Sequence, residues 1–476
     1  MSRRLQRLLI ANRGEIAVRI IRAARAARVE TIAVYSEADA GALHVRLADR
    51  AILIGPSPAR QSYLSIDRLL DAAIQSGADA VHPGYGFLAE NADFAHAVTN
   101  QGLVFVGPSA ETIRVMGDKR RARECAVAAG VEVVPGTGAD PSPDELEKFV
   151  STVQFPVLVK AVAGGSGRGM RLVERKEDLA ERIDEARREA EAAFGNGSVL
   201  LEKYLERPRH IEVQVFGDGR GQVVHLFERD CSVQRRHQKL VEESPAPGLH
   251  PRLRERICAA AVKVAQAVGY EGAGTVELLV EGGANPDDAF YFLEMNTRIQ
   301  VEHPVTEEVT GIDLVREQLQ VATGAGFSFD PSSLEQRGHA IELRIYAEDC
   351  RKSFAPQSGR LQYISRSGGP GVREDGWAEA GTTISPYYDS LLTKLIFSGP
   401  DRQATIERAI ATVDTFVVDG LPTTLDFHRW LLRTEAFRSG AVDVKWVERE
   451  YRGEVVPPQS VGPLRLPDTD GDAAED

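Results

Sequence analysis

Short apolar segments and helical patterns alternate over the first 115 residues of the chain. The apolar segments, typical of buried strands, lie at residues 8–12, 31–36, 51–55, 78–84 and 103–107. After the first of them, Ile16, Ile20 and Ile21 recur at helical spacing, and the arginines opposite them are interpreted as a solvated helix face. This alternation predicts an α/β arrangement with a parallel, doubly wound sheet.

The pattern changes beyond residue 130. A strand at 156–161, a glycine-rich stretch, a charged helix and a strand at 198–205 predict a compact α+β unit. Longer apolar or alternating runs, which predict a large antiparallel sheet, follow at 209–218, 221–236, 274–280 and 290–296. We expect further strands over 339–400 and helices over 401–450, and the Pro-rich, acidic end of the chain is typical of disorder.

Composition narrows the class of protein. The 476 residues carry a formal net charge of −13, which argues against general nucleic-acid binding but leaves room for a local basic pocket. None of the four cysteines belongs to a CxxC pair, so we expect free thiols in a reducing compartment. Neither a secretory leader nor a run of about 18 apolar residues is found, so a cytoplasmic protein without a membrane span is expected.

A glycine-rich loop, AVAGGSGRGM, contains Gly164, Gly165, Gly167 and Gly169. Glycines let a backbone approach phosphate closely and leave its N–H groups open to an anion. The loop lacks the GK[ST] ending of a P-loop, so a lid over phosphates is one interpretation and a merely flexible turn is its equal rival.

Two lysines and a polar cluster surround this loop in the sequence. Lys160 lies in an apolar strand and needs an anionic partner, whereas Lys119 taken alone is better interpreted as a solvated surface lysine. Together the two could converge on a triphosphate. In LEKYLERPRH, backbone groups near Leu205 could hold a purine while Glu202 and His210 reach a ribose. An ordinary strand–turn–strand is the alternative.

The run ERDCSVQRRHQK places Gln234, His237 and Lys239 in a strand-like stretch, which suits oxyanion recognition, although charge runs are usually solvated. Glu277 and Glu294 then lie among apolar residues on two separate strands, where an unpaired charge is expensive. Two carboxylates with an asparagine, here Asn296, are ligands that Mg²⁺ bridging phosphates requires; buried salt bridges are the alternative.

The segment NTRIQVEHPVTE carries the most specific pattern. Arg298, Gln300 and Glu302 alternate, so they share one face if the segment is extended. Arginine and glutamine form a fork for a small planar oxyanion, and Glu302 is a candidate base beside it. Arg344, a lone cation in a predicted strand, faces either this site or a carboxylate partner.

These motifs together resemble the biotin carboxylase family. The segments HPGYGFLAEN, MGDK, KAVAGGSGRGM, EKYLERPRHIEVQV, ERDCSVQRRHQK, EMNTRIQVEHPVTE, RIYAED and YYDSLLTKLI occur in the family's order over about residues 5–448. The resemblance implies an ATP-grasp fold: a Rossmann-like pre-ATP-grasp domain (1–115), an ATP-binding region (116–331) with a mobile lid at about 132–205, a C-terminal domain (332–448) and a disordered acidic tail (449–476).

The resemblance also implies a role for each site residue. Contacts to ATP are expected from Lys119, Lys160, Gly164, Gly165, Gly167, Gly169, Glu202, Lys203, Leu205, His210, Gln234, His237, Glu277 and Glu294. Mg²⁺ or Mn²⁺ is expected on Glu277, Glu294 and Asn296, and bicarbonate on Lys239, Arg298, Gln300 and Val301. Biotin is expected near Tyr85 and Arg344, with Asp389 as a lesser site position. Catalytic roles fall to Glu302, as base, and to Arg344, Arg298 and Lys239.

The resemblance further implies partners. The chain contains no Met-Lys-Met segment, so biotin is expected to arrive on a separate biotin carboxyl carrier protein, with a carboxyltransferase subunit beyond it and a homodimer as the assembly. Ala163 replaces a glycine of the usual loop, and Tyr346 resembles acyl-CoA carboxylase subunits as much as dedicated acetyl-CoA carboxylase. Competing functions are another ATP-grasp ligase, which would join a carboxylate to an amine, and a non-catalytic ATP-binding subunit.

Overall fold

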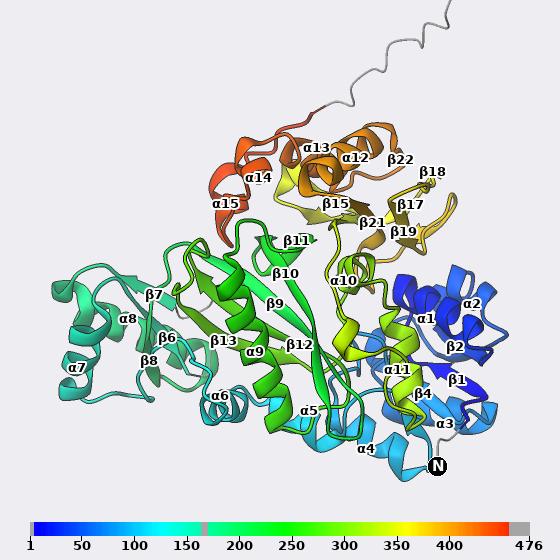
Figure 1. Cartoon of the computed structure of the whole chain (residues 1–476), viewed down its shortest axis with the longest axis horizontal. Coiled ribbons are helices and arrows are strands. Elements are labelled where there is room, and N and C mark those ends of the chain that lie inside the picture. The colour runs from blue at the N-terminus through cyan, green and yellow to red at the C-terminus, as the bar shows by residue number, and fades with distance from the viewer. Residues whose placement is uncertain (1–3, 163–169, 457–476) are drawn as a thin grey trace, which may run out of the picture.

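The computed structural model describes residues 4–162 and 170–456, and its N-terminal part is built on a five-stranded parallel sheet (Figure 1). The strand order is β3-β2-β1-β4-β5, with bounds Arg50–Gly55, Glu30–Ser36, Arg7–Ile10, Ala80–His82 and Val104–Phe105. Alternate side chains of β1 enter two cores: Leu8 and Ile10 pack with helix α1 (Gly14–Ala26), and Leu9 packs with the other face. Helices α3 (Ile66–Ser76) and α4 (Ala92–Asn100) cover that second face, as the sequence predicts.

An eight-stranded antiparallel sheet forms the centre of the molecule. Its order is β13-β12-β9-β10-β11-β14-β21-β19, with bounds Phe290–Asn296, Gly272–Glu281, Pro208–Gly217, Val223–Arg235, Gln238–Ser244, His339–Tyr346, Leu391–Gly399 and Val372–Gly376. Ile211, Val213 and Val215 of β9 point into a core shared with helix α9 (Pro251–Ala267). The residues between them face the opposite side of the sheet, where the polar side chains gather.

The C-terminal third adds its strands to this same sheet rather than forming a second one, because β11 pairs directly with β14. The other C-terminal elements are α12 (Arg402–Thr415), α13 (Leu425–Leu431), α14 (Glu435–Ser439), α15 (Trp446–Glu450) and the short strands β15 (Glu348–Asp349), β16 (Ala355–Pro356), β17 (Gly359–Arg360), β18 (Tyr363–Ile364), β20 (Thr383–Ile384) and β22 (Val418–Asp419). The expected boundary at residue 448 falls inside α15, and Tyr451 beyond it is buried in the C-terminal core. The expected disordered tail therefore begins too early; residues 457–476 lie outside the described ranges.

A smaller unit projects from the left of the molecule in Figure 1. Its three-stranded antiparallel sheet has the order β7-β6-β8 (Met170–Val173, Val157–Ala161, Val199–Lys203) and packs with helices α7 (Pro143–Val153) and α8 (Leu179–Phe194). The unit is joined to the large sheet through the segment after α6 (Lys119–Ala128), where Val133 bridges Phe292 of β13 and Gly136 bridges Glu202 of β8. This unit coincides with the expected lid, and the glycines of the expected phosphate loop lie outside the described residues.

Two local predictions are wrong. The stretch 234–239 is not one strand but a hairpin, in which Arg236 and His237 both have positive φ (49° and 67°) between β10 and β11. The segment 297–302 is not extended either: it is an irregular loop that leads into α10 (His303–Thr310), with Glu302 at the position before the first helical residue. Pro304 at the second helical position favours this start, because proline has no N–H to donate within a helix.

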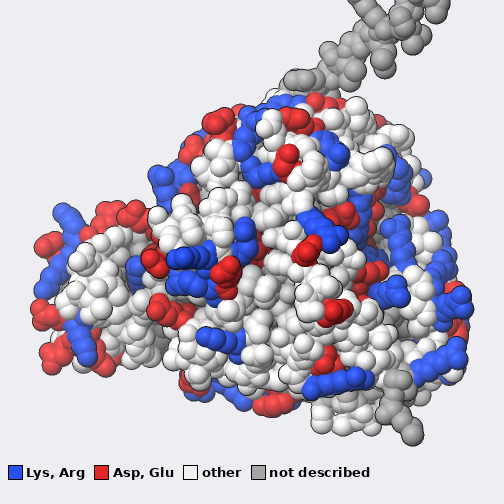
Figure 2. Space-filling view, in the orientation of Figure 1, with Lys and Arg blue, Asp and Glu red and all other residues white. Residues whose placement is uncertain are grey.

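The surface carries both signs of charge. Figure 2 shows acidic and basic side chains interspersed over the visible face. Within the described ranges, every helix falls short of the length and apolar character that crossing a membrane requires. The four cysteines are free thiols, as expected.

Candidate active site

Charged side chains gather on the face of the large sheet opposite α9. On β9, His210, Glu212 and Gln214 alternate with the core residues, so all three point to this face. Glu212 lies opposite Glu277 of β12 in the strand register, which brings two carboxylates together. Such a cluster is stable only with cations among the acids, because unpaired buried charge is costly.

Lys239 on β11 supplies the central cation. Its Nζ lies 2.6 Å from Glu212, 2.9 Å from Glu277 and 2.7 Å from Glu302. Burial lowers the pKa of Lys239, but the three carboxylates outweigh burial and raise the pKa well above its usual value. Burial likewise raises the pKa of Glu302, but Lys239 and Arg344 outweigh it and hold the pKa well below the usual range. Lys239 and Glu302 therefore form a charged pair in spite of their burial.

Arg229 on β10 is a second buried cation of the cluster, and it is absent from the residues predicted from sequence. Its side chain is fully buried and donates to Glu212 (2.6 Å), Gln214 (2.8 Å), Thr275 (3.1 Å) and Thr306 (2.9 Å). With four of its five N–H groups engaged within the protein, Arg229 holds Glu212 in place. Glu212 was also not predicted from sequence. Arg229 and Glu212 are charged residues inside apolar strands, as Glu277 is, and this pattern could have identified both of them.

The loop 297–302 brings an arginine and an amide beside this cluster. Arg298 donates to Gln300 Oε1 (3.0 Å), to Asn296 Oδ1 (3.1 Å) and to Glu90 (2.8 Å). Gln300 in turn approaches Glu277 at 3.4 Å. The predicted meeting of Arg298, Gln300 and the acidic cluster is therefore present, although a loop and not a strand produces it. Glu90 lies 208 positions away in the sequence, and no local signal points to it.

Arg344 on β14 connects Glu302 to a further carboxylate. Its guanidinium donates to Glu302 (2.8 Å) and pairs with Glu242 of β11. The sequence left open whether Arg344 faces the site or a carboxylate partner, and the structure shows that it does both. The Arg344 side chain also approaches the hydroxyl of Tyr346 (3.3 Å). The Arg344 guanidinium thus lies between two carboxylates, Glu242 and the candidate base Glu302.

The residues expected to hold a metal ion lie on neighbouring strands. Glu277 and Glu294 are directly opposite in the register of β12 and β13, and Asn296 Nδ2 donates to Glu277 (2.9 Å). Although the Glu294 side chain is exposed, local desolvation of its carboxyl group and the negative charge of Glu277 raise its pKa, and Lys119 opposes this shift. The expectation that Glu294 is buried is wrong, since its side chain is exposed. A pair of facing carboxylates, one of them open to solvent, fits a divalent cation that binds oxygen ligands.

The expected nucleotide contacts divide between the two sheets. His210 lies 3.0 Å from Glu277 and 3.1 Å from the Gln234 amide. In the smaller sheet Lys160 does have the anionic partner that its apolar strand requires, because it pairs with Glu202. Glu202 also accepts from Arg123 (3.3 Å), another residue that was not predicted from sequence.

The remaining nucleotide candidates lie where β8 leaves the smaller sheet. Lys203 pairs with Glu281 (2.8 Å) and donates to the Tyr291 hydroxyl (3.2 Å), while Leu205 is buried with Val134 and Tyr291. His237 is exposed at the hairpin turn, so the structure does not bring it into the buried cluster.

The two expected biotin residues, Tyr85 and Arg344, are connected through Tyr346, which interacts electrostatically with Tyr85 and accepts from Arg344. The Tyr85 hydroxyl donates to Glu15, and burial raises the pKa of Tyr85, to which the negative charges of Glu15 and Asp389 contribute. Burial also raises the pKa of Tyr346. The positive charge of Arg344 opposes this shift, and the negative charge of Asp389 adds to it. Tyr85, Asp389 and Tyr346 are therefore within electrostatic reach of one another.

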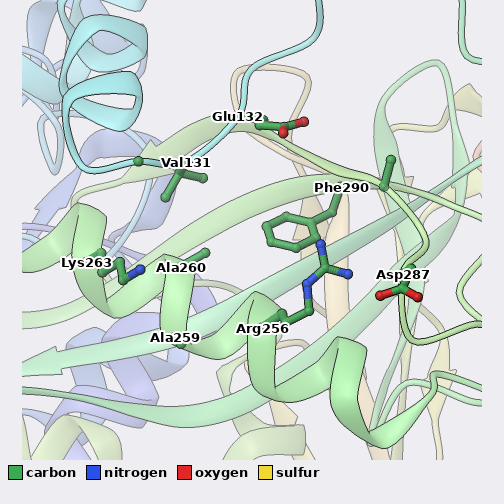
Figure 3. A pocket seen from close by; sticks show the side chains of 10 residues that line it. Val131, Glu132, Arg256, Ala259, Ala260, Lys263, Asp287 and Phe290 are labelled. Atoms are coloured by element: carbon green, nitrogen blue, oxygen red, sulfur yellow. The ribbon is translucent and has the colours of Figure 1, made fainter.

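A separate cavity lies on the far side of the sheet from these residues (Figure 3). Its volume is about 430 Å³, and Arg256 and Lys263 of α9 face Glu132, Asp287 and Phe290 across it. Arg256 is engaged by the Phe290 ring (5.2 Å) and the carbonyl of Pro286 (2.7 Å). None of its lining residues is a predicted site residue, so this cavity and the charged cluster are distinct.

The fold and the cluster together define a class. A large antiparallel sheet with acidic and basic side chains on one face, and a small α+β unit that carries further lysines, are the two halves of an ATP-grasp enzyme. Residues 118–329 match the ATP-binding domain of the carbamoyl-phosphate synthase L chain. Residues 4–113 and 342–449 match the N-terminal and C-terminal domains of biotin carboxylase.

The chain belongs to the biotin carboxylase family. It is 48% identical over 449 residues to biotin carboxylase from Pseudomonas aeruginosa, covering 94% of this chain and 98% of that one. It is equally 48% identical over 448 residues to a pyruvate carboxylase subunit from Methanothermobacter thermautotrophicus (94% and 90% covered). Among solved structures, the biotin carboxylase domain of a thermophilic 2-oxoglutarate carboxylase bound to bicarbonate superimposes with a TM-score of 0.89 at 41% identity, covering 94% and 98%.

Proposed function

We propose that this protein uses ATP and bicarbonate to carboxylate biotin held on a separate biotin carboxyl carrier protein. The observation that carries the proposal is the buried array Lys239–Glu302–Arg344, with its contacts of 2.7 and 2.8 Å, next to the Arg298–Gln300 fork. An enzyme that joins a carboxylate to an amine has no need of this fork beside a base. A non-catalytic subunit has no need of a buried base at all.

The same residues account for each step. Glu302 takes the proton of bicarbonate, whose oxygen attacks the γ-phosphorus of ATP to give carboxyphosphate and ADP. Carboxyphosphate then breaks into CO₂ and phosphate, and the phosphate takes the ureido proton of biotin. The resulting biotin enolate attacks CO₂, with Arg344 stabilising its negative charge.

Binding residues act around these steps. Arg298, Gln300 and the Val301 segment hold bicarbonate, and Lys119, Lys160, His210, His237 and the glycine loop hold the nucleotide. Glu277, Glu294 and Asn296 would hold Mg²⁺ or Mn²⁺, which supplies positive charge to the phosphate oxygens. Lys239 keeps Glu277 and Glu302 ionised in a buried site where both would otherwise take up protons.

The final acceptor of the carboxyl group is expected to bind to a partner subunit and not to this chain. Relatives of nearly equal identity are named for biotin carboxylase and for pyruvate carboxylase, so identity alone does not select an acceptor. We favour acetyl-CoA or another acyl-CoA, delivered through a carboxyltransferase subunit, with the chain itself as a homodimer. Identification of the subunit that co-purifies with this chain tests this assignment.

The activity is tested by following ATP hydrolysis by the purified protein. We expect slow turnover that requires bicarbonate and becomes faster when free biotin is added. A matched preparation of Glu302→Gln serves as the control for contaminating ATPase. Turnover that responds to neither bicarbonate nor biotin would contradict the proposal.

A further inference from the structure

A buried ion pair joins β21 to α1 beside the candidate active site. Lys394 of β21 is fully buried, and its Nζ lies 3.1 Å from Oε1 of Glu15 in the first turn of α1. Burial lowers the pKa of Lys394, but the carboxylates of Glu15, Glu342 and Asp375 outweigh it and raise the pKa. The lysine is therefore charged, and such a charge is retained at a cost that packing with apolar residues would avoid.

The Lys394 ammonium also holds the loop that carries the bicarbonate residues. Its Nζ donates to the backbone oxygen of Val301 at 2.7 Å. The side chains on either side of Val301 point to the charged cluster, because Gln300 approaches Glu277 and Glu302 contacts Lys239. Lys394 thus fixes the main chain of this loop, and it does so from the face of the sheet that also carries Arg344.

Glu15 extends the same contact to the expected biotin residue. Its Oε1 accepts from the Tyr85 hydroxyl, and the Tyr85 carbonyl accepts from Asn12 (2.7 Å) just before α1. In the strand register Lys394 also lies opposite Arg344. One ion pair is therefore connected to the bicarbonate loop, to Tyr85 and to the strand that carries Arg344.

We propose that Lys394 and Glu15 are a positioning pair, which sets the Val301 loop and Tyr85 at a fixed separation so that CO₂ forms within reach of biotin. This inference rests on the proposed function. Neither side chain needs to touch a substrate, since each acts through Val301 or Tyr85. Transfer between two bound groups is sensitive to small displacements, and misplacement by about 1 Å can cost about a hundredfold in rate.

The double variant Lys394→Met/Glu15→Gln tests this proposal. Removing both charges avoids the unpaired Glu15 carboxylate that Lys394→Met alone would leave, and the neighbouring Asp375 keeps its ion pair with Arg373 (2.7 Å). Arg433→Met is the control, because it breaks an ion pair elsewhere, at 2.7 Å between Arg433 in the turn after α13 and Asp414 of α12. Thermal unfolding of each variant establishes that it is folded before kinetics are compared.

Steady-state ATP turnover is then measured against ATP, bicarbonate and free biotin in turn. We expect the KM values for bicarbonate and biotin to rise about tenfold in the double variant. The KM for ATP stays within about twofold, because the pair touches no predicted nucleotide residue. The Arg433→Met control leaves all three unchanged. Unchanged KM values for bicarbonate and biotin, or an equal rise for ATP, would overturn the positioning role.

Tyr85→Phe tests the contact of Glu15 with Tyr85 separately from the contact of Lys394 with Val301. This test does not depend on whether the double variant folds. It removes only the hydroxyl that Glu15 holds, so the KM for biotin rises while that for bicarbonate is unchanged. A biotin KM equal to that of the wild type would refute the connection through Tyr85. If the wild type itself fails to respond to bicarbonate and biotin, the proposed function fails first, before any variant is compared.

Discussion

Glu302 is held between Lys239 and Arg344, and this arrangement determines how strong a base it can be. Both cations lower its pKa in the free protein, so it is ionised but only weakly basic. Bicarbonate that enters beside Arg298 brings a second negative charge, with which the same cations must be shared. Sharing them raises the proton affinity of Glu302 at the moment when a proton is to be taken.

The variant Glu302→Gln tests this role at the residue scale. It keeps the shape of the side chain but cannot accept the proton, so we expect kcat for bicarbonate-dependent ATP turnover to fall at least about a hundredfold. The KM for ATP changes by less than about threefold, because Glu302 contacts none of the predicted nucleotide residues. Initial rates at several ATP concentrations measure both quantities.

Glu228→Gln is the matched control for this variant. Glu228 is equally buried on the same sheet, but it pairs with Arg254 (2.7 Å) and accepts from the backbone of Ala246, away from the cluster. A comparable loss of kcat in Glu228→Gln, or a large loss of ATP affinity in Glu302→Gln, would contradict the assignment of Glu302 as the base.

At the scale of elements, periodicity predicts what is repeated and misses what is irregular. The parallel sheet, the large antiparallel sheet and the small α+β unit follow from alternating or continuous apolar runs, and all are present. The hairpin turn at Arg236 and His237 carries no glycine or asparagine to announce it, so its run of polar residues predicts a single strand. The alternation in the loop before α10 likewise predicts a strand that the structure does not form.

The site could be predicted only where its residues stand out within their own segments. Glu277 and Lys160 are charged residues inside apolar strands. Because an unpaired buried charge is costly, each is expected to have a partner of opposite charge, and the structure provides Lys239 and Glu202. Glu90, Glu15 and Lys394 gain their meaning from contacts across 208 or more positions of sequence. Only the folded chain brings such residues together, so no local pattern indicates them.

Gly217, at the end of β9, gives a prediction for the element that carries His210 and Glu212. A Cβ there would lie 1.8 Å from the backbone oxygen of Tyr270, and backbone cannot move aside without breaking the pairing of Gly217 with Gly272. We expect Gly217→Ala to lower the free energy of unfolding by about 3 kcal/mol, measured by urea denaturation.

Gly41→Ala provides the comparison for this substitution. A Cβ at the exposed Gly41 meets nothing within 4 Å, so its unfolding free energy stays within about 0.5 kcal/mol of the wild type. Equal stability of Gly217→Ala and the wild type would show that β9 and β12 can shift apart at this end without loss.

At the scale of the whole molecule, buried ionisable groups act on stability in opposite directions. Burial lowers the pKa of His44 and of His428 to about 4, so both favour the folded protein at higher pH. Burial raises the pKa of Glu242 to about 7 and raises that of Glu342 well above its usual value, so both favour the folded protein at lower pH. Stability is therefore greatest between the two sets of transitions.

His44→Gln isolates one of these contributions. The unfolded protein binds a proton at this position below about pH 6.5 and the folded protein only near pH 4, so wild-type stability falls as pH falls through this window. Relative to the glutamine variant, we expect the wild type to lose roughly 3 kcal/mol between pH 7.5 and pH 4. Urea titrations of both proteins across this range measure the difference, and a constant difference would refute it.

The direct pairing of β11 with β14 has a consequence for how such chains can diversify. Main-chain hydrogen bonds join the segment that carries Lys239 to the segment that carries Arg344, in one register. A genetic crossover between related sequences near residue 332 would therefore combine strands whose facing side chains have separate histories. At the two crossings into the small unit, near residues 133–136 and 203–205, the pairing with the large sheet is limited to a single bridge between Val133 and Phe292 among the described residues. Variation in this lineage is thus expected to travel as whole small units and seldom as C-terminal thirds.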